Sequence, residues 1–264
     1  MNACAQVTAS VVSHGQMGLV NTLIADLAHH CGGQLKRLVV TLNLPEAEPI
    51  RSEGVPFEVV VRRNERPLGF GVNHNRAFDH CDTAWFAVLN PDLRLSNDAL
   101  GLLVAAREPN DGLIAPLILN ADHSPADAAR RLPTPLGVGA RKLRRQTRGP
   151  DSDFDWLAGM CLMLNAEAFR SLRGFDERFF MYCEDIDLCL RMQLAGWRLR
   201  RVTGIKLIHE ARRDSHRSLR YLCWHVASLA RLWTSHVFWS YLAKRGELGP
   251  MRESAFNTKP LQTP

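Results

Sequence analysis

The segment Gly174–Arg191 has the sequence GFDERFFMYCEDIDLCLR and concentrates five acidic residues within twelve positions. Aromatic and aliphatic neighbours restrict the access of water, and partial desolvation raises the pKa of a carboxylate. A carboxylate in that state is suited to take a proton from a hydroxyl group. Glu184 and Asp185 are therefore candidates for general base chemistry. The alternative is that they only stabilise the first turn of a helix, where acidic residues meet the positive end of the helix dipole.

A second group of candidates follows apolar runs that are predicted to be strands. The tripeptide Asn90–Asp92 follows Trp85–Leu89, and His209 follows Ile205–Ile208. Carboxylate oxygens and a neutral imidazole are suitable ligands for Mg²⁺ or Mn²⁺. Each feature also has a plainer explanation, because Asn-Pro-Asp is common in turns and a single histidine is more often a surface or core residue.

The elements that must position these residues alternate along the chain. Leu19, Leu23 and Leu27 are four residues apart and predict a helix over Met17–Cys31, and a further helix is expected near Asn75–His80. The predicted strands are Val7–Ser13, Leu35–Leu42, Phe57–Val61, Trp85–Leu89 and Leu113–Leu119. This alternation predicts an α/β fold with a mostly parallel central sheet flanked by helices, and with ligands beyond the carboxyl ends of the strands.

Regular patterns return in the second half of the sequence after a long irregular stretch. A strand is expected at Trp156–Leu164, and helices at Ala166–Leu172 and Glu184–Ala195. The basic run Arg141–Arg148 within the irregular stretch is interpreted as a solvated loop.

The composition limits the class of protein and of partner. With 264 residues, 46% of them hydrophobic and 23% charged, the chain is neither collagen-like nor wholly disordered. The net charge of +6 is unevenly distributed, because residues 197–264 contain 13 Lys or Arg against 4 Asp or Glu. No zinc finger, RNP-like motif or recognition helix accompanies this charge, so no nucleic acid partner is expected. A phosphorylated acceptor or an anionic membrane surface fits better.

The seven cysteines include no CxxC pair, which favours reduced thiols in the cytoplasm. The N-terminal sequence lacks the pattern of a secretory signal, and no apolar run is long enough to span a membrane. A cytoplasmic protein, in peripheral contact with the inner membrane face, is the resulting expectation.

The basic tail carries a helical pattern over Arg217–Leu242. Two alternatives stay open for its apolar stripe: packing on the rest of the protein, or lying in a membrane interface with Trp224 and Trp239. The basic residues Arg212 and Arg213 are placed to meet phosphates. The stripe consists of Leu219, Leu222, Cys223, Val226, Leu229, Ala230, Trp233 and Val237.

Taken in order, these motifs resemble family 2 glycosyltransferases with a GT-A fold, and the rhamnosyltransferase-like branch in particular. The resemblance covers about Val7–His216, and Gly174–Arg191 is its most specific part. The motifs that carry it are the Asn64–Ala77 stretch with Gly69-Phe70-Gly71 and Asn73-His74-Asn75, then Leu89-Asn90-Pro91-Asp92, Gly159, the acidic run and His209.

The resemblance implies roles for individual residues. Asp92 matches the last acid of an Asp-x-Asp-type motif, and with His209 it would hold Mn²⁺ or Mg²⁺. Asn90 stands where the family has the first acid of that motif. Asp185 matches the base that deprotonates the acceptor hydroxyl, and Glu184 matches a residue that positions the acceptor.

The nucleotide side of the site is implied in the same way. The ends of the first two strands would meet the donor nucleotide, and the loop and helix around the Gly-Phe-Gly turn would complete that side. The donor would be a UDP-sugar or a dTDP-sugar. The nucleotide-side residues are Ser13, His14, Asn43, Gly69, Phe70, Asn75, Asn90 and Asp92.

The predicted function is therefore an inverting, metal-dependent glycosyltransferase that acts on a glycan or lipid-linked acceptor in cell-surface polysaccharide assembly. A catalytic domain over 1–212 would be followed by a basic helical extension over 213–264. Two alternatives are a non-catalytic nucleotide-binding relative, which the loss of the acid at Asn90 favours, and a nucleotidyltransferase. The second lacks a glycine-rich, lysine-containing triphosphate loop near the first strand.

Overall fold

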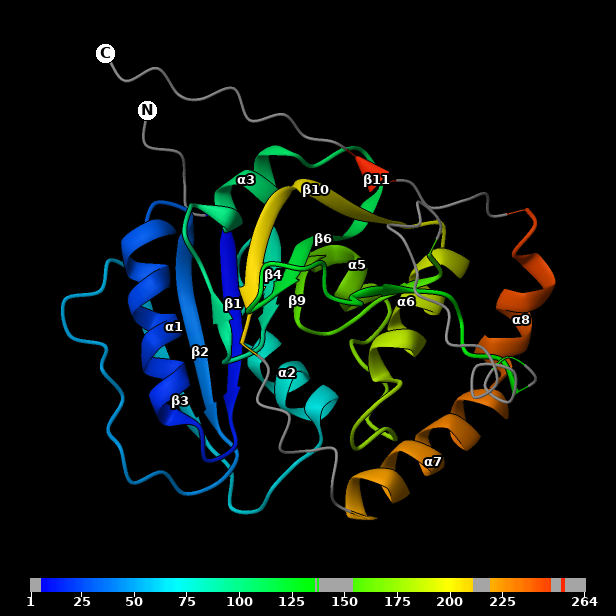
Figure 1. The fold of residues 1–264 in the computed structure, drawn as a ribbon, viewed down its shortest axis with the longest axis horizontal. Helices are drawn as coiled ribbons and strands as arrows, with labels where there is room; N and C mark the ends of the chain where they lie inside the picture. Colours follow the sequence, from blue (N-terminus) through cyan, green and yellow to red (C-terminus); the bar gives the residue numbers. More distant parts are fainter. Residues whose placement is uncertain (1–5, 136, 138–153, 211–218, 248–252, 255–264) are drawn as a thin grey trace.

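The computed structural model describes residues 6–135, 137, 154–210, 219–247 and 253–254 (Figure 1). The predicted loop Arg141–Arg148 and the residues Arg212 and Arg213 lie outside the described residues, as does the predicted domain boundary at residue 212.

The amino-terminal half forms one side of a parallel sheet. β1 (Val7–Ser13) lies between β2 (Leu35–Leu42) and β4 (Trp85–Leu89) and is parallel to both, while β3 (Glu58–Arg63) extends the sheet beyond β2. β1, β2 and β4 are mostly buried, which explains their nearly continuous apolar sequences. The predicted strands agree closely with these four.

The second half of the sheet departs from simple alternation. Within the described residues, nine strands join in the order β11-β10-β6-β9-β4-β1-β2-β3, with β5 (Leu93–Arg94) paired to β10. β9 (Cys161–Asn165) is antiparallel to both β4 and β6 (Asp111–Asn120). β10 (Arg198–His209) is parallel to β6 and to β11 (Glu253–Ser254).

The single strand predicted at Trp156–Leu164 is two strands. β8 (Trp156–Leu157) pairs with β7 (Ala129–Arg130) in a separate small sheet, and only the second part, β9, enters the main sheet. The break falls at Ala158–Met160, which includes Gly159, and these residues line the cavity described below. A turn that lines this cavity therefore interrupts what the sequence pattern predicts as one element.

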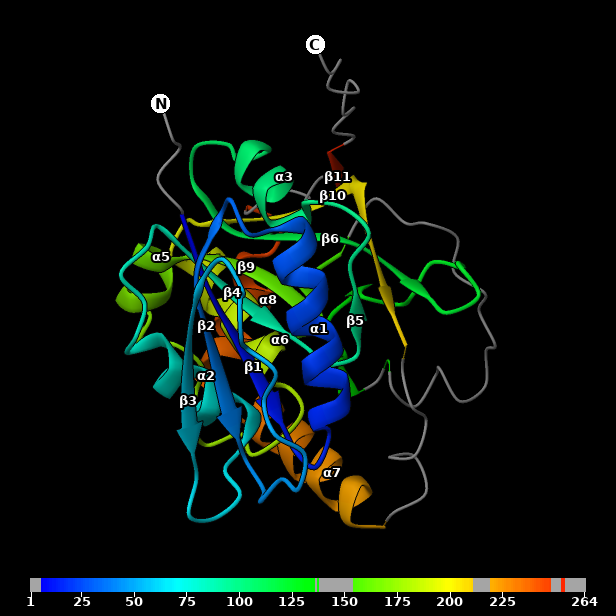
Figure 2. The same ribbon diagram turned by 90° about the vertical axis from the view of Figure 1, so that its left-hand side faces the viewer.

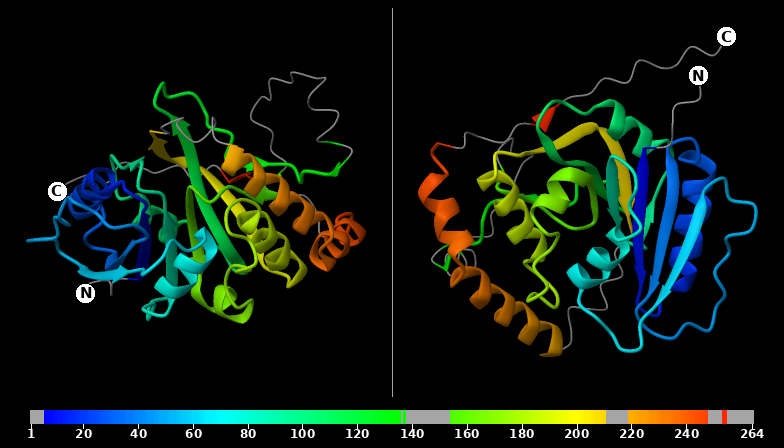
Figure 3. Two further views of the ribbon diagram at one scale, coloured as in Figure 1. Left: turned by 90° about the horizontal axis from the view of Figure 1, so that it is seen from below. Right: turned by 180° about the vertical axis from the view of Figure 1, so that it is seen from behind.

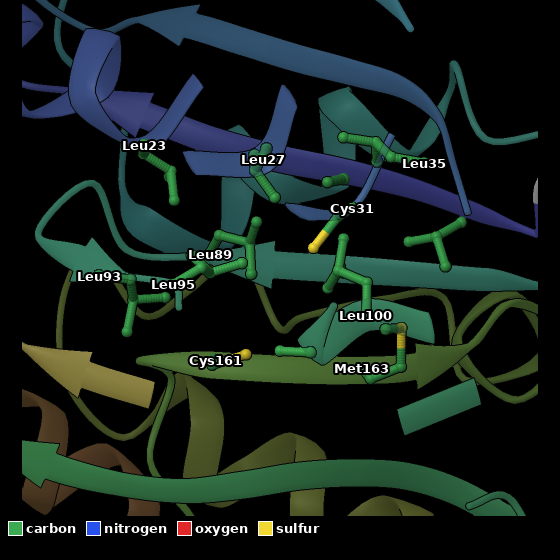
Figure 4. Packing of buried hydrophobic residues seen from close by; sticks show 14 of the residues in the cluster. Leu23, Leu27, Cys31, Leu35, Leu89, Leu93, Leu95, Leu100, Cys161 and Met163 are labelled. Atoms are coloured by element: carbon green, nitrogen blue, oxygen red, sulfur yellow. The ribbon is translucent and has the colours of Figure 1, made fainter. Parts of the chain in front are cut away.

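Helices cover both faces of the sheet. α1 (Met17–His30) and α3 (Ala99–Ala105) pack on one face of the sheet. Figure 2 shows α1 in front of the strands. Leu23, Leu27 and Cys31 point from this helix region toward the sheet in Figure 4, and all three are fully buried. The predicted spacing of four residues therefore does mark the buried side of α1.

The opposite face carries α2 (Phe70–Phe78), α5 (Ala166–Ser171) and α6 (Glu184–Leu194). α2 begins five residues before the predicted helix near Asn75, because Gly69 has extended backbone angles and leads directly into the helix. Buried aromatic side chains, including Phe86, Phe169 and Phe175, form much of this second core. It holds the amino-terminal end of α6 against the sheet.

The tail forms α7 (Leu219–Trp233) and α8 (His236–Lys244), which lie beside α6 in Figures 1 and 3. The single predicted helical pattern is divided where Ser235 caps α8 by accepting a hydrogen bond from the Phe238 N–H at 3.2 Å. Phe238 and Tyr241 are buried in the second core. No helix in the described part of the chain is both long and apolar enough to cross a bilayer.

The predicted apolar stripe packs on the protein only in part, because Leu229, Trp233 and Val237 contact the second core whereas its other side is exposed. Leu222 and Val226 are each 58% exposed. The packed side consists of Ser228 and Leu232, which are buried, with Trp224 and other partly buried side chains beside them. Aromatic side chains of the tail meet aromatic side chains near α6, and this contact overrides the aliphatic periodicity.

Candidate active site

A cavity of about 500 Å³ opens where β1, β2 and β4 end. This is the edge at which open parallel sheets bind ligands, and the volume suits a small-molecule site. The amino-terminal ends of α2 and α6 and one side of α7 complete its wall. Among the residues that the sequence singles out, the cavity is lined by His14, Asn43, Phe70, Asn90, Asp92, Glu184 and Asp185.

Asp92 and His209 meet through strand pairing. His209 lies opposite Leu93 in the antiparallel pair of β10 and β5, and the backbone N–H of Glu210 donates to the Asp92 carbonyl oxygen at 2.9 Å. This register brings the Asp92 Oδ1 atom to 3.0 Å from His209 Nε2. The amide nitrogen of Asn90 is 3.4 Å from the same imidazole nitrogen. Two distant segments therefore meet beside the cavity, which Asn90 and Asp92 line and His209 does not.

This convergence fits a divalent cation. Asp92 Oδ1 is buried and, within the described residues, accepts no hydrogen bond. An unsatisfied carboxylate oxygen beside an imidazole nitrogen offers the oxygen and nitrogen ligands that Mn²⁺ accepts. In the described part of the chain no group of three or more His, Cys, Asp and Glu side chains is arranged to hold a metal.

Asp185 is held in a fixed orientation at the amino-terminal end of α6. Its Oδ2 accepts a hydrogen bond from the Gly159 N–H at 3.0 Å, and its Oδ1 accepts one from the Ile186 N–H at 2.9 Å. Burial raises the pKa of the Asp185 carboxyl above its ordinary range, and these two N–H donors offset part of the rise. A carboxylate that is both oriented and raised in pKa is suited to accept a proton.

Glu184 presents a different environment beside it. Its side chain is only 6% exposed, and within the described residues its Oε2 has no hydrogen-bond partner. Burial and the neighbouring charge of Asp185 raise the pKa of Glu184 well above its usual value. Because buried polar atoms are rarely left unpaired, this oxygen is poised to meet a group that enters the cavity.

The backbone before these carboxylates is strained. Tyr182 and Cys183 have φ angles of 72° and 67°, in the left-handed region that residues other than glycine seldom adopt. Such strain typically costs about 1–3 kcal/mol per residue and is concentrated at functional sites. Here the left-handed conformation of Tyr182 and Cys183 directs the chain into α6, and both carboxylates line the cavity.

The predicted nucleotide side is a polar network around Asn43. Its amide nitrogen donates to His14 Nδ1 at 3.1 Å and to the Leu68 carbonyl oxygen at 3.0 Å. Its Oδ1 accepts from Asn64 Nδ2 and from the Leu68 N–H, both at 2.8 Å. Asn43 therefore fixes the loop that precedes α2, and His14 and Asn43 line the cavity together.

Ser13 is not among the residues that line the cavity. Its hydroxyl is buried, donates to Glu46 Oε1, and accepts from the Gln16 N–H at 3.1 Å. The same Glu46 oxygen accepts from the Gly15 N–H at 2.9 Å. Ser13 and Glu46 thus order the turn between β1 and α1 behind His14.

Gly69 lies where two backbone segments approach closely. A Cβ atom at Gly69 would stand 2.6 Å from the Phe180 carbonyl oxygen, and the Phe70 N–H donates to that oxygen at 2.9 Å. Only glycine fits this approach. The contact joins the start of α2 to the segment before α6 and places the Phe70 ring in the cavity wall.

Asn75 lies in a different place from the other predicted residues. Its amide nitrogen donates to the Phe175 carbonyl oxygen at 2.9 Å, and its Oδ1 accepts from the Phe175 N–H at 2.8 Å. Its side chain lines a second cavity, of about 400 Å³, together with Glu177 and Gly174. The structure thus shows Asn75 bracing the glycine turn that leads toward α6.

Several cavity residues are absent from the sequence-based set. His74 is buried, its Nδ1 is 2.8 Å from the Ser10 hydroxyl, and burial lowers its pKa to about 3, so the ring is neutral. The Asn73-His74-Asn75 motif in the sequence is the feature that could have indicated a place for His74 in the cavity. Tyr221 and Trp224 come from α7, and nothing in the sequence indicated that this helix reaches the cavity.

Comparison with known proteins supports a shared ancestry. The family model described as Glycosyl transferase family 2 matches residues 47–172 of this chain. The model described as Glycosyl transferase family group 2 matches residues 142–245. Rhamnosyltransferase WbbL of Escherichia coli K12 is 31% identical over 182 residues, covering 62% of this chain and 69% of WbbL. The N-acetylglucosaminyl-diphospho-decaprenol L-rhamnosyltransferase of Mycobacterium tuberculosis H37Rv is 29% identical over 221 residues, covering 67% and 72% of the two chains.

Solved structures share the fold at low sequence identity. GalNAc-T7 with UDP, GalNAc and Mn²⁺ has a TM-score of 0.63 at 18% identity, and the match covers 92% of this chain but about half, 51%, of GalNAc-T7. The mannosyltransferase PcManGT from Pyrobaculum calidifontis, in complex with GDP-Man and Mn²⁺, has a TM-score of 0.58 at 13% identity, with 93% and 76% covered. The sheet order and these matches identify a GT-A fold. The family model and the rhamnosyltransferase relatives show that this chain belongs to glycosyltransferase family 2 and to its rhamnosyltransferase-like members.

Proposed function

We propose that this protein is an inverting, metal-dependent glycosyltransferase that moves a hexosyl or deoxyhexosyl group from a UDP-sugar or dTDP-sugar to a hydroxyl group. The acceptor would be a glycan or a lipid-linked saccharide used in cell-surface polysaccharide assembly. One observation carries the proposal: Asp92, which is paired with His209, and the oriented carboxylate of Asp185 line the same cavity.

At the donor end, Asp92 and His209 would hold Mn²⁺ or Mg²⁺. When bound, the ion would act as a Lewis acid for the negative charge that develops on the leaving diphosphate. His14, Asn43 and Asn90 line this polar region and would contact the nucleotide through hydrogen bonds. Phe70 supplies an apolar surface in the same wall.

At the acceptor end, Asp185 would take the proton from the attacking hydroxyl. Its two N–H donors hold the carboxylate in place, and its raised pKa improves its strength as a base. The hydroxyl oxygen then displaces the diphosphate from the opposite face of the anomeric carbon, which inverts the configuration. The unpaired Glu184 Oε2 would accept a second acceptor hydroxyl and position the sugar.

A peripheral position at the inner membrane face is part of the proposal. α7 exposes Leu222 and Val226, and α8 exposes Trp239. The described part of the tail also carries Arg220 and Lys244, which would favour anionic headgroups. An apolar surface with basic neighbours is typical of an interfacial helix and would bring a lipid-linked acceptor close to the cavity.

The first test is calorimetric titration of the protein with UDP and with dTDP, each with and without Mn²⁺. Hydrolysis and transfer of the matching sugar nucleotides are measured in parallel for the wild type, Asp92→Ala and Asp185→Asn. We expect metal-dependent nucleotide binding that Asp92→Ala weakens. We expect Asp185→Asn to keep that binding and to lower turnover by about 100-fold or more.

An exposed carboxylate provides the matched control. Asp122 lies in a surface turn, and its carboxylate accepts hydrogen bonds from the backbone N–H and the hydroxyl of Ser124. Asp122→Asn should leave binding and turnover unchanged. Unchanged turnover in both Asp92→Ala and Asp185→Asn would overturn the assigned roles. Binding without turnover across a broad set of acceptors would instead support a non-catalytic nucleotide-binding protein, the reading that Asn90 favours.

A further inference from the structure

The described side of α7 that faces the cavity is aromatic. Tyr221 and Trp224 of this helix line the cavity with Phe180 and Tyr182 of the segment before α6. We call these four side chains the aromatic shelf. The Phe180 and Trp224 ring centroids are 4.8 Å apart, and those of Tyr221 and Trp224 are 5.3 Å apart in an edge-to-face arrangement. The rings of Phe180, Trp224 and Tyr221 thus contact one another in sequence, and Tyr182 packs against His225 of α7 with ring centroids 4.9 Å apart. The shelf is built from two distant parts of the chain.

The shelf is held rigidly in place. Ser228 donates its hydroxyl to the Met181 carbonyl oxygen at 2.8 Å, and Leu232 is fully buried beneath α7. Arg231 donates to the Arg178 carbonyl oxygen. The Arg220 guanidinium lies 4.7 Å from the centroid of the Trp224 ring. A surface that is already ordered loses little conformational entropy when a ligand binds.

The cavity lining contains two kinds of surface. Asn43, Asn90 and Asp92 are polar, whereas the aromatic shelf is mostly apolar. Glu184, whose Oε2 has no hydrogen-bond partner among the described residues, lines the same cavity. A ligand that contacts both the shelf and Glu184 therefore needs an apolar surface and at least one hydroxyl donor at its edge. A pyranose ring has both, because its C–H bonds form apolar faces and its hydroxyl groups form a polar rim.

We propose that the aromatic shelf is the acceptor subsite, where an acceptor sugar packs into the corner between the perpendicular rings of Trp224 and Tyr221 and donates a hydroxyl to Glu184 Oε2. This inference rests on the proposed glycosyl transfer and assigns α7 a part in acceptor recognition. It also separates the two sides of α7: Trp224 and Tyr221 face the saccharide, while Leu222 and Val226 face away from the protein.

The test compares Trp224→Ala with Trp224→Phe, Ser228→Ala and His236→Ala. His236 is an exposed ring at the start of α8 and is not among the residues that line the cavity, so it is the control for loss of a ring from the tail. Ser228→Ala removes the hydrogen bond to Met181 but keeps the shelf, so it controls for loosening of α7. Donor hydrolysis without acceptor, donor KM, acceptor KM and melting temperature are measured for each variant.

We expect Trp224→Ala to raise the acceptor KM by about tenfold, from lost aromatic contact and apolar burial. Donor KM and acceptor-free donor hydrolysis should stay within about twofold of the wild type. Trp224→Phe should recover much of the acceptor affinity, and His236→Ala should match the wild type. Ser228→Ala should lower the melting temperature without a comparable rise in acceptor KM.

Saturation-transfer NMR with a methyl glycoside of N-acetylglucosamine and one of rhamnose measures saccharide binding without turnover. Wild-type binding that Trp224→Ala abolishes would support the shelf even in protein that transfers no sugar, which keeps its test distinct from that of the proposed function. An unchanged acceptor KM in Trp224→Ala would overturn the inference. So would equal losses of donor hydrolysis and transfer, or wild-type protein that binds neither glycoside.

Discussion

The Asp92 Oδ1 atom lies 3.0 Å from His209 Nε2 because β5 pairs with the last residues of β10. Asp92 immediately precedes β5, and His209 is the last residue of β10. The antiparallel register places His209 opposite Leu93, so a shift of one residue would turn the imidazole to the other side of the strand. The pairing of the two-residue strand β5 with β10 therefore positions the two side chains of the proposed metal site.

Substitution of His209 should expose the metal dependence of the reaction. We expect His209→Ala to lower turnover by about 100-fold at a fixed low Mn²⁺ concentration, since one stabilising contact to developing charge is typically worth that much. Excess Mn²⁺ should restore part of the loss. Turnover measured across a Mn²⁺ titration checks this, with His29→Ala as the control because His29 is an exposed residue near the end of α1. An unchanged Mn²⁺ dependence in His209→Ala would contradict the pairing.

The pH dependence of turnover should report the Asp185 carboxyl. Burial raises its pKa above the ordinary value of 3.8, and only the ionised form can accept the proton. Turnover should therefore rise with pH and reach half of its plateau above pH 3.8. A profile of kcat/KM at saturating metal checks the sign. Turnover that falls as the pH rises through this region would exclude Asp185 as the base.

Glu184→Gln should make the protein more stable and less active. The folded-state pKa of Glu184 lies well above its ordinary value of 4.5, so the folded protein holds a proton that the unfolded chain releases. Binding of this proton by the folded state stabilises the protein at low pH, and this stabilisation is lost as the pH rises toward the folded-state pKa. Because glutamine resembles the protonated form, the variant's gain should be larger at pH 8 than at pH 5.

Thermal unfolding at the two pH values measures that gain, and a transfer assay measures the accompanying loss of activity. Glu177→Gln, at an exposed carboxylate before α6, should show no comparable change with pH. A gain in the melting temperature of Glu184→Gln that is larger at pH 5 than at pH 8 would contradict the assigned direction of the pKa.

The contact between α8 and Asp155 should contribute to the stability of the whole protein. The Tyr241 hydroxyl donates to Asp155 Oδ1 at 2.9 Å, Arg245 is 2.9 Å from the same carboxylate, and Asp155 Oδ2 accepts from the Leu132 N–H at 2.7 Å. Asp155→Ala leaves several donors unpaired and should reduce the free energy of unfolding by about 3 kcal/mol. Tyr241→Phe should cost about 1–2 kcal/mol.

Urea unfolding followed by circular dichroism measures both changes. Asp82→Ala is the control, because its ion pair with Lys36 is about half exposed and typically worth at most about 1 kcal/mol. Equal effects of Asp155→Ala and Asp82→Ala would show that α8 adds little to the folded body.

Much of the fold could be predicted from local patterns. The strands β1, β2 and β4 and the helix α1 have apolar sequences whose period matches their geometry. The pattern failed where tertiary contacts decide the structure. β9 lies antiparallel between β4 and β6, and α7 turns Leu222 and Val226 outward while Leu229 and Trp233 of the same apolar stripe pack on the second core.

The candidate site divides in the same way. The sequence by itself determined the chemical types at the strand ends and before α6, because Asp92, Glu184, Asp185 and His209 belong to motifs that can be recognised by their order along the chain. Only the tertiary structure decided which of these side chains meet. It paired Asp92 with His209 through strand register, turned Asn75 to a second cavity, and brought Trp224 to the first. The physical reason is that motif chemistry is encoded locally, whereas contacts between distant segments depend on how the sheet and its helices pack.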